Sequence, residues 1–492
     1  MNKPPHNART LLLIIAIIVL ALLPPLYAHR NNPLPLHADE YVHLALSQEL
    51  AQTGFLAAAN PYFAFNWTAT VTQSEPLLQA VTVELSTLLD QSPLAITVLL
   101  PYLFSALFAL AAYAAGNRYA GPRAGAFAAL TAILFKTTLT VLGPSYAVPF
   151  ALGATVFLLF MLAIESNNSA LAAVLGAIAV FINPPLAAAL VLGTFCFALF
   201  DRLSDKTNPF PLKIASALAV LLVLAMLPRL FFTGTAPADV IAQIHFPLAT
   251  EDFAGTFASI SLVNQAGFLV LVLSLLGAWH SWRTRKCAPL AFALPLAAIT
   301  LLAEPLGTSP FLPYRRAAGY FAVAVLPLAA IGADALAKKI SERFPKVKPV
   351  HVIILLALLL LAWEAPATAR GLDQNYEYFS LAEAPIVPWL ASDALKTGSR
   401  PTILASLRRS TAITPLSNNF LHVCGTVGAV LWPGPLADEM ARLDEMPCDE
   451  LRQLYRTCNA SYYYADHDVG CWFATPVLAS QELEFYAFEL AP

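Results

Sequence analysis

Two stretches near the start of the chain indicate its fold: the apolar run "LLLIIAIIVLALLPPLY" at 11–27 and the polar run "HADEYVHLALSQELAQTG" at 37–54. The first has about the length of a membrane span. We interpret it as uncleaved, because no small-residue cleavage site precedes Asp39 and further apolar runs follow. The second places the acidic pair Asp39–Glu40 just outside the bilayer. Together they predict a membrane protein whose first outward loop begins with two carboxylates.

The composition of the whole chain supports this interpretation. Of its 492 residues, 58% are hydrophobic and only 12% are charged, and the mean hydropathy is +0.65. Soluble chains are about 25% charged, so we expect an all-α polytopic membrane protein. The net charge of −3 gives no indication of nucleic-acid binding. The chain has neither a Walker-type phosphate loop nor a zinc-protease His-Glu pair, which argues against a nucleotide-driven pump.

Hydropathy predicts about eleven transmembrane helices. They are expected at 11–27, 94–116, 124–142, 146–164, 169–183, 185–200, 211–232, 261–280, 288–303, 317–337 and 349–364. With the N-terminus in the cytoplasm, most Lys and Arg residues fall on the cytoplasmic side, and the outward loops between spans keep only Arg30, Arg229, Arg315 and Arg316. This asymmetry favours a multi-pass protein of the plasma (inner) membrane with a cytoplasmic N-terminus.

The expected organisation has two parts. Residues 1–364 form a transmembrane module with outward loops at 28–93 and 233–260, and residues 365–492 form an extracytoplasmic α/β domain. In that tail "PTILAS" and "ASYYYA" resemble strands, whereas "PLADEMARLDEM" and "DELRQLYR" resemble helices. Four of the six cysteines lie there, which suggests two disulfides with three pairings open: Cys424, Cys448, Cys458 and Cys471.

The acidic pair begins a predicted helix. The chain is extended through Pro33 and Pro35, and the apolar pattern then continues to Gly54, a helix stop. Asp39 suits the N-cap or the first turn, where the helix dipole favours a carboxylate. We expect this helix to lie along the membrane surface, with a second such helix in "SEPLLQAVTVELSTLLDQSP". By itself, Asp39 could be no more than a helix cap.

The order of these features resembles a known family. "DEYVHLALSQELAQTG" after the first span, "SEPLLQAVTVELSTLLDQSP" before a second span followed by "NRYAG", the late "PYRRAAGYFAVAVLPLAA" and the outward tail are together similar to the GT-C superfamily of integral-membrane glycosyltransferases. The resemblance implies inverting transfer of a sugar from a polyprenyl-phosphate-linked donor to an acceptor on the outer face. By position, Asp39 matches the catalytic general base and Glu40 the second acid of the protein O-mannosyltransferase-like branch.

The resemblance also implies cations for the leaving phosphate and groups that contact the substrates. For the phosphate we select cations near the outer ends of predicted spans: Arg315, Arg316, Arg229 and Lys136. The alternatives are lipid headgroup binding for the arginine pair and snorkelling for Lys136. As substrate-binding candidates we select His43, Glu75 and Tyr314.

A metal is the open question of the site. Oligosaccharyltransferases of the superfamily bind a divalent cation through acidic loop residues, but the corresponding loop here, "GPSYAVP", has no carboxylate. Glu251 and Asp252 in the later loop are weak candidates. A divalent metal (Mg or Mn) therefore stays open as a cofactor.

Other classes of membrane protein remain alternatives. A transporter or flippase of lipid-linked saccharide would carry charges within its spans and often inverted repeats, and we find no repeat. A non-catalytic membrane assembly protein is the other alternative. Among enzymes, the main competing prediction is a polysaccharide polymerase or ligase. The expected partners are the bilayer, a polyprenyl-phosphate sugar lipid and an acceptor protein, glycolipid or polysaccharide, with no nucleic acid.

Overall fold

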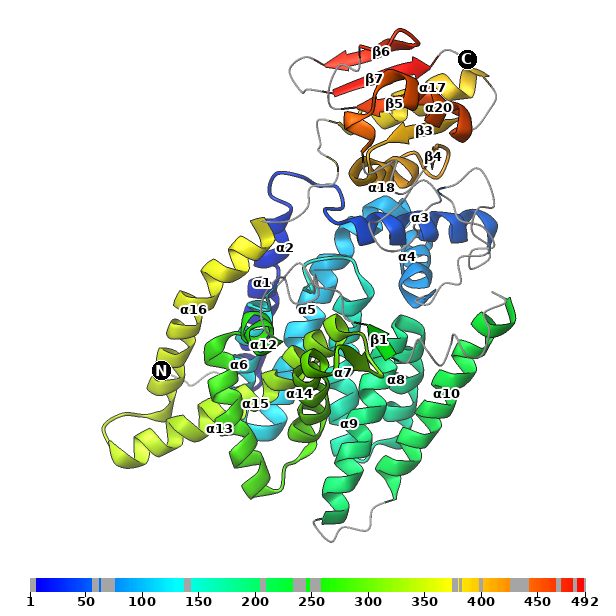
Figure 1. Cartoon of the computed structure of the whole chain (residues 1–492). Helices are drawn as coiled ribbons and strands as arrows, with labels where there is room; N and C mark the ends of the chain where they lie inside the picture. The colour runs from blue at the N-terminus through cyan, green and yellow to red at the C-terminus, as the bar shows by residue number, and fades with distance from the viewer. Residues whose placement is uncertain are drawn as a thin grey trace. The chain divides into compact units, whose positions relative to one another are not determined.

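The structure is a computed structural model of the chain (Figure 1). It describes residues 6–54, 62, 76–136, 143–203, 209–232, 245–247, 258–373, 379, 383–397, 401–424, 442–465, 470–480 and 485–490. The contacts within the chain divide it into two compact units. We call residues 1–28 with 100–374 the helical unit and residues 29–99 with 375–492 the sheet unit, and we describe each by itself.

The helical unit follows the apolar runs of the sequence. Its elements are α1 (His6–Ala21), α2 (Leu23–Ala28), α5 (Pro93–Ala120), which begins in the sheet unit, α6 (Pro122–Ile133), α7 (Pro149–Glu165), α8 (Ser169–Ile182), α9 (Pro184–Leu203), α10 (Phe210–Phe232), α12 (Ala258–Ala266), α13 (Phe268–Thr284), α14 (Ala288–Leu306), α15 (Tyr314–Arg343), α16 (Pro349–Asp373) and the strand pair β1 (His245–Pro247) and β2 (Thr308–Pro310). Among the described residues, five helical stretches are long and apolar enough to cross a membrane. The chain is an integral membrane protein, and the count of about eleven spans stays a prediction.

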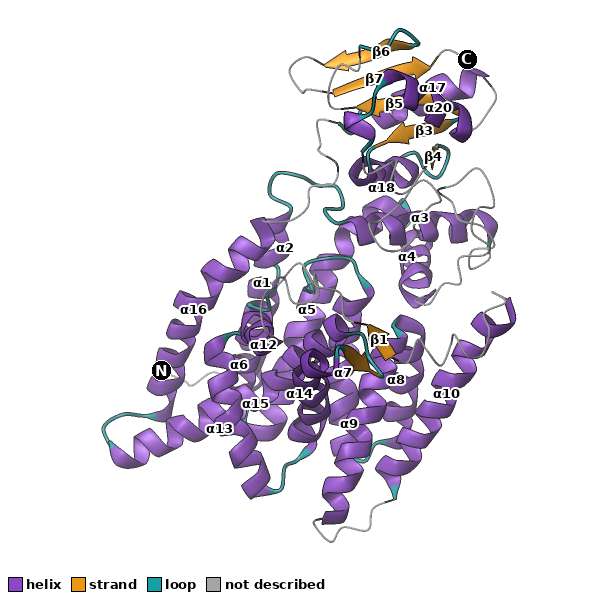
Figure 2. Ribbon diagram, in the orientation of Figure 1, coloured by secondary structure: helices purple, strands orange, loops and turns teal. Residues whose placement is uncertain are grey.

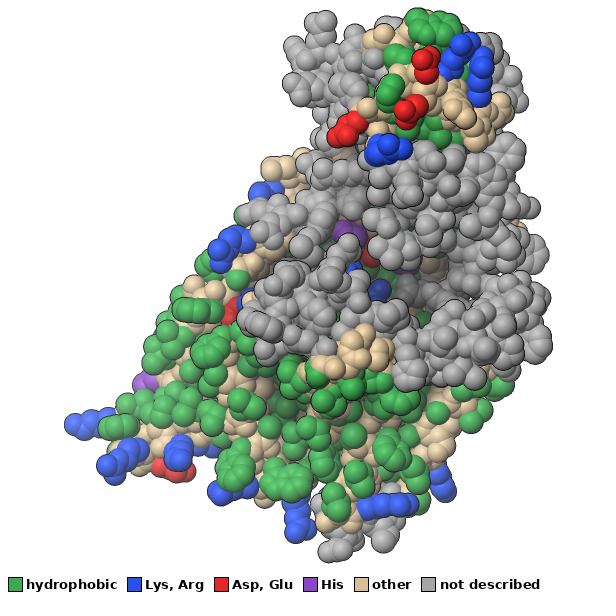
Figure 3. All heavy atoms as spheres, viewed as in Figure 1, with side chains coloured by type: hydrophobic (Ala, Val, Ile, Leu, Met, Phe, Trp, Pro, Cys, Tyr) green, Lys and Arg blue, Asp and Glu red, His purple; other side chains and the backbone are tan. Residues whose placement is uncertain are grey.

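Helix α15 is the central helix of this unit, with nearly its whole length buried. Helix α13 crosses it at glycines: a Cβ added at Gly277 would lie 1.8 Å from the carbonyl oxygen of Leu328, and one at Gly332 would lie 1.9 Å from that of Leu273. Small residues let helix backbones approach closely in a membrane, where packing drives association. Figure 3 shows apolar side chains over much of the unit's described surface, with Lys and Arg gathered at one end.

Apart from the one-residue turn at Leu22 between α1 and α2, two predicted spans are interrupted. The run expected at 261–280 is two helices, α12 and α13, separated by Gly267, whose φ of 89° is outside the helical region. The span expected at 124–142 ends as α6 at Ile133, and residues 137–142 lie outside the described part of the chain. Hydropathy does not locate either break, because its window averages the polar residues Asn264, Gln265 and Lys136 with the apolar residues around them.

The sheet unit holds the larger sheet (Figure 2). Its elements are α3 (Ala38–Thr53), α4 (Pro76–Leu89), α17 (Ile386–Thr397), β3 (Thr402–Ala405), α18 (Leu407–Leu416), β4 (His422–Cys424), the 3₁₀ turn Leu443–Glu445, α20 (Cys448–Cys458), β5 (Ala460–Ala465), β6 (Ala474–Ser480) and β7 (Phe485–Leu490). The strand order is β4-β3-β5-β7-β6, with β4, β3 and β5 parallel and β5, β7 and β6 antiparallel. The two expected strands are β3 and β5, and "DELRQLYR" lies in α20, whereas 435–441 are outside the described residues.

Helix α3 is part of the core of the sheet unit. Tyr41, Val42, Ala45 and Leu46 are buried in one cluster with residues of α17, α18, β3 and β5. The apolar side of this helix therefore packs on protein, and its position along the membrane surface stays a prediction. The contacts of the loop that we grouped with the transmembrane module lie in the sheet unit.

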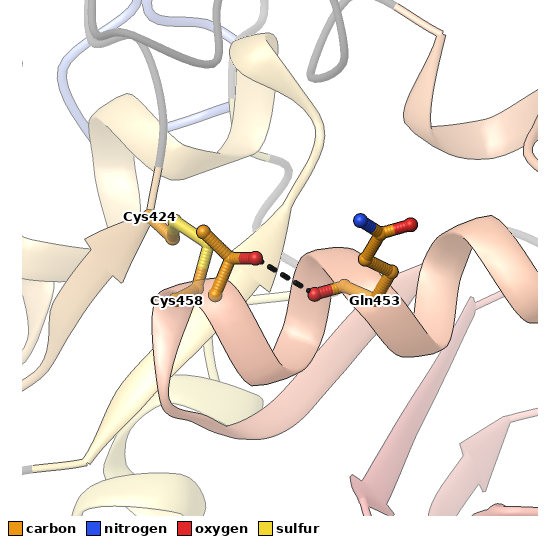
Figure 4. The surroundings of a disulfide bond; sticks show 4 residues. Cys424, Gln453 and Cys458 are labelled. Carbon is orange, nitrogen blue, oxygen red and sulfur yellow. Dashed lines mark hydrogen bonds between the residues drawn. A yellow bond between two sulfur atoms is a disulfide. The ribbon is translucent and has the colours of Figure 1, made fainter.

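Two disulfides fix the other half of this unit. Of the three open pairings, the structure has Cys424–Cys458 and Cys448–Cys471. The first joins the end of β4 to the end of α20 (Figure 4). Beside it, the hydroxyl of Thr457 donates a hydrogen bond to the carbonyl of Gln453. The second joins the start of α20 to the residue before Trp472. Both termini of α20 are thus attached covalently to the sheet region.

Candidate functional site

The start of α3 is fixed by hydrogen bonds from its own residues. His37, and not Asp39, is the N-cap, and its Nδ1 accepts the backbone N–H of Asp39 at 3.1 Å. Because Nδ1 accepts, the imidazole proton lies on Nε2. Glu40 Oε2 accepts the backbone N–H groups of Leu36 at 2.8 Å and His37 at 3.0 Å. This reciprocal arrangement is a capping box with histidine in place of serine or threonine.

The two acids of the pair therefore occupy different environments. Glu40 is only 1% exposed, and its carboxylate accepts hydrogen bonds at the helix start, so it does not face water. Asp39 lies in the first turn and its side chain is 36% exposed. Among the described residues none donates a hydrogen bond to its carboxylate, and Nδ1 of the His37 ring lies 3.9 Å from its Oδ1. Of the two acids, Asp39 is the one available to an incoming group.

His43 lies one turn after Asp39 on the same face of α3. Its Nδ1 accepts a hydrogen bond from the side-chain amide of Gln79 at 2.9 Å, which joins α3 to α4. Gln79 is itself 1% exposed. The imidazole therefore has a fixed orientation beside Asp39. Glu75, the other substrate candidate of this loop, lies outside the described residues.

The predicted phosphate ligands Arg315 and Arg316 lie in the first turn of α15, in the helical unit. Both side chains are half-buried, and Tyr314 beside them is 3% exposed. No acidic residue lies in this turn, and no side chain caps it. Positive charge at a helix N-terminus opposes the helix dipole. An anion bound there would gain from both the guanidinium groups and the backbone N–H groups.

Lys136 has a partner that the sequence analysis did not identify. Its Nζ lies 2.7 Å from Oε2 of Glu364, on α16, and the two side chains are 16% and 2% exposed. The sequence analysis predicted that Lys136 binds the donor phosphate or snorkels toward the headgroups, and neither prediction included this ion pair. One signal could have indicated it: Glu364 is a lone acid at the end of the apolar run "LALLLLAWE".

The side chains of the remaining candidates, Arg229, Glu251 and Asp252, lie outside the part of the chain that the structure describes. Of these residues, Arg229 falls in α10. Within the residues that the structure does describe, no group of three His, Cys, Asp or Glu side chains could hold a metal ion. The structure thus places Asp39, Glu40 and His43 together on α3, and Tyr314, Arg315 and Arg316 together on α15.

Comparisons with known proteins identify the fold. No family model matches the sequence, and no curated protein matches it. Solved structures do match. ArnT from Cupriavidus metallidurans bound to undecaprenyl phosphate is similar over 98% of both chains, with a TM-score of 0.61 and 12% identity. The oligosaccharyltransferase of Archaeoglobus fulgidus is similar over 92% of this chain and 69% of that chain, with a TM-score of 0.59 and 12% identity.

A third match is the arabinofuranosyltransferase AftD from Mycobacteria. The similarity covers 97% of this chain and 40% of that chain, with a TM-score of 0.55 and 15% identity. All three neighbours are GT-C glycosyltransferases. At these identities the similarity shows a shared fold, and the chain has the fold of the GT-C membrane glycosyltransferases.

Proposed function

From this GT-C fold we propose that the chain is an inverting glycosyltransferase. It moves a sugar from a polyprenyl-phosphate-linked donor to an acceptor on the outer face of the membrane. ArnT has been solved with undecaprenyl phosphate and the archaeal oligosaccharyltransferase with a dolichol-phosphate and a peptide. These neighbours support a lipid-phosphate donor for this chain, whereas the sugar and the acceptor are left open.

The observation that carries the catalytic assignment is the contrast between the two acids of α3. Glu40 is committed to backbone N–H groups, whereas Asp39 is partly exposed on a helix start fixed by His37 and Glu40. We assign Asp39 as the general base, since a carboxylate within hydrogen-bond reach can take a hydroxyl proton. The assignment gives Glu40 a positioning role.

The reaction then balances as follows. Asp39 takes the proton of the acceptor hydroxyl, and the acceptor oxygen bonds to the anomeric carbon of the donor. The bond from that carbon to the phosphate oxygen breaks, and polyprenyl phosphate leaves with the electron pair while the configuration inverts. The negative charge that develops on the phosphate requires cations, for which we propose Arg315 and Arg316, with Arg229 and Lys136 as further contributors.

Donor turnover tests the assignment. Membranes with wild type or Asp39→Asn are given a set of radiolabelled polyprenyl-phosphate sugars, and released polyprenyl phosphate is measured. We expect turnover to fall at least about a hundredfold in Asp39→Asn. Asp90→Asn is the matched control, because Asp90 is an exposed carboxylate of the same unit and asparagine tolerates its φ of 51°.

Each outcome has a consequence. Equal turnover in Asp39→Asn and wild type would make Asp39 a first-turn stabiliser of α3 and no base. Absence of turnover in both, across the donor set, would favour the alternatives of a lipid-linked saccharide flippase or a non-catalytic assembly protein. The same assay with a chelator tests whether a divalent metal takes part.

A further inference from the structure

The ion pair Lys136–Glu364 is a polar site inside the helical unit. Lys136 follows the end of α6, and its ammonium lies 2.7 Å from Glu364 Oε2. The backbone around the lysine is also held: the Gln265 amide donates to the carbonyl of Lys136 at 3.0 Å, and the Thr368 hydroxyl donates to that of Leu134 at 2.9 Å. Side chains of α12 and α16 thus satisfy carbonyls left open where α6 ends.

Glu364 is buried with less hydrogen bonding than a carboxylate requires. It is 2% exposed, and among the described residues its Oε1 has no hydrogen-bond partner. A Cβ at Gly267 would lie 2.5 Å from that oxygen, and the φ of 89° at this residue favours glycine. A buried ion pair with incomplete hydrogen bonding adds little stability, and an apolar pair of equal volume often does as well. A contribution to stability therefore does not by itself explain why a buried glutamate is present at position 364.

The position of the pair connects it to the proposed phosphate site. Lys136 and Glu364 line a small cavity together with Ala322 and Leu326 of α15. Arg315 precedes Ala322 by seven residues, so it lies on the same face of α15, about 10 Å along the axis. The neighbour of Glu364, Trp363, is 68% exposed, as expected of an aromatic residue at a membrane interface. Lys136 therefore lies against the same face of α15 on which Arg315 occupies the first turn.

We propose that Lys136 binds the phosphate of the donor lipid and of the leaving lipid, and that Glu364 is a built-in competing anion for the same ammonium. This inference rests on the proposed function. An ammonium has three donors, and the contact with Glu364 occupies one side of it. A phosphate that takes another donor lies within a few ångströms of the carboxylate and is repelled by it. Glu364 therefore lowers the affinity of Lys136 for polyprenyl phosphate and favours release of that product.

Binding of polyprenyl phosphate to the full chain tests this. Wild type, Glu364→Gln and Lys136→Met are compared in phosphatidylcholine nanodiscs by titration with polyprenyl phosphate and, in parallel, with inorganic phosphate. We expect Glu364→Gln to lower Kd for polyprenyl phosphate at least about fivefold, the effect of removing one like charge about 4 Å away even in a water-like dielectric. We expect Lys136→Met to raise Kd. A change with inorganic phosphate as well would assign the effect to the phosphate group alone, and a change with the lipid only would require its tail.

Asp334→Asn is the matched control. Asp334 is a second buried carboxylate of the helical unit, 2.7 Å from Lys338, and we assign it no part in phosphate binding. Its substitution should leave Kd unchanged. An unchanged or higher Kd in Glu364→Gln would overturn the inference and leave the pair a structural contact.

Two further arrangements keep the test decisive. If Glu364→Gln does not fold, Lys136→Met decides the test, and an unchanged or lower Kd for polyprenyl phosphate in that variant would overturn the inference. Sugar transfer is measured separately. Transfer by wild type with unchanged Kd in Glu364→Gln refutes this inference alone, whereas tighter lipid binding without any transfer refutes the proposed function alone.

Discussion

Glu40 gives the sharpest prediction, because its neighbour in the sequence has the opposite role. Its Oε2 accepts two backbone N–H groups at 2.8 and 3.0 Å and is buried. Hydrogen bonds to a charged acceptor contribute roughly 1.5–3 kcal/mol each, and neutral ones about 0.5–1.5 kcal/mol. Glu40→Gln keeps one acceptor oxygen but loses the charge, so we expect a loss of ~2 kcal/mol. Glu40→Ala leaves both donors without an acceptor, and we expect ~4 kcal/mol.

Thermal unfolding of the purified chain, followed by a signal of the sheet unit, measures the effect. For a unit of this size roughly 2–4 °C of Tm correspond to 1 kcal/mol, so Glu40→Gln should lower Tm by about 4–8 °C. Asp39→Asn is the comparison. The Asp39 carboxylate accepts no hydrogen bond from the described residues, and its substitution removes only a favourable dipole interaction of roughly 0.5 kcal/mol.

Turnover below the transition completes the test. Glu40→Gln should keep kcat within about threefold of wild type, whereas Asp39→Asn should lose it with little change in Tm. A Glu40→Gln protein with wild-type Tm and no turnover would refute the reasoning, because it would make Glu40 a catalytic group and the capping box incidental. Loss of both properties in both variants would mean that the helix start cannot be separated from the chemistry.

The remaining predictions concern packing and covalent links. Gly277→Val should abolish recovery of folded protein, because its Cβ would lie 1.8 Å from the Leu328 carbonyl oxygen; monodispersity by gel filtration measures this, and normal recovery would refute the α13–α15 crossing. Replacing Cys448 and Cys471 by serine opens a link between residues 23 positions apart and should cost ~3 kcal/mol. Denaturation of wild type and of this double variant, both without reductant, measures the loss, and an equal midpoint would show that the disulfide does not form.

Much of the helical unit could be predicted because a span is a local property of the sequence. The runs at 169–183 and 211–232 are α8 and α10 nearly to the residue. The breaks were not predictable by the same argument. Just after the end of helix α6, Gln265 and Thr368 donate hydrogen bonds to the carbonyls of Lys136 and Leu134, and Thr368 is 234 positions from its acceptor. Hydropathy averages apolarity over a window and carries no information on partners so distant.

The sheet unit shows a similar limit. The β-rich segments at β3 and β5 were detected from composition, whereas β4, β6 and β7 were missed, although "FYAFEL" alternates as a strand should. The disulfide pairing was open because it depends on strand order. Cys424 ends β4, which pairs with β3, and β3 pairs with β5, the strand that follows α20 and Cys458. The spacing of the cysteines in the sequence does not show which strands are neighbours, so it could not predict the pairing.

The different environments of Asp39 and Glu40 show how the residue that caps a helix determines which of two adjacent acids is accessible. Adjacent carboxylates cannot be told apart by residue type, and the resemblance assigned catalysis to both. The difference arises from the residue before them. Because His37 caps α3 through Nδ1, the helix begins one residue before Asp39, and the third helical position, which reaches back to the cap backbone, falls to Glu40. Asp39 then occupies the second position, where its carboxylate faces outward. A cap one residue earlier would make Asp39 the third helical position and give it the capping role, so the availability of the proposed base depends on a histidine that itself need not touch a substrate.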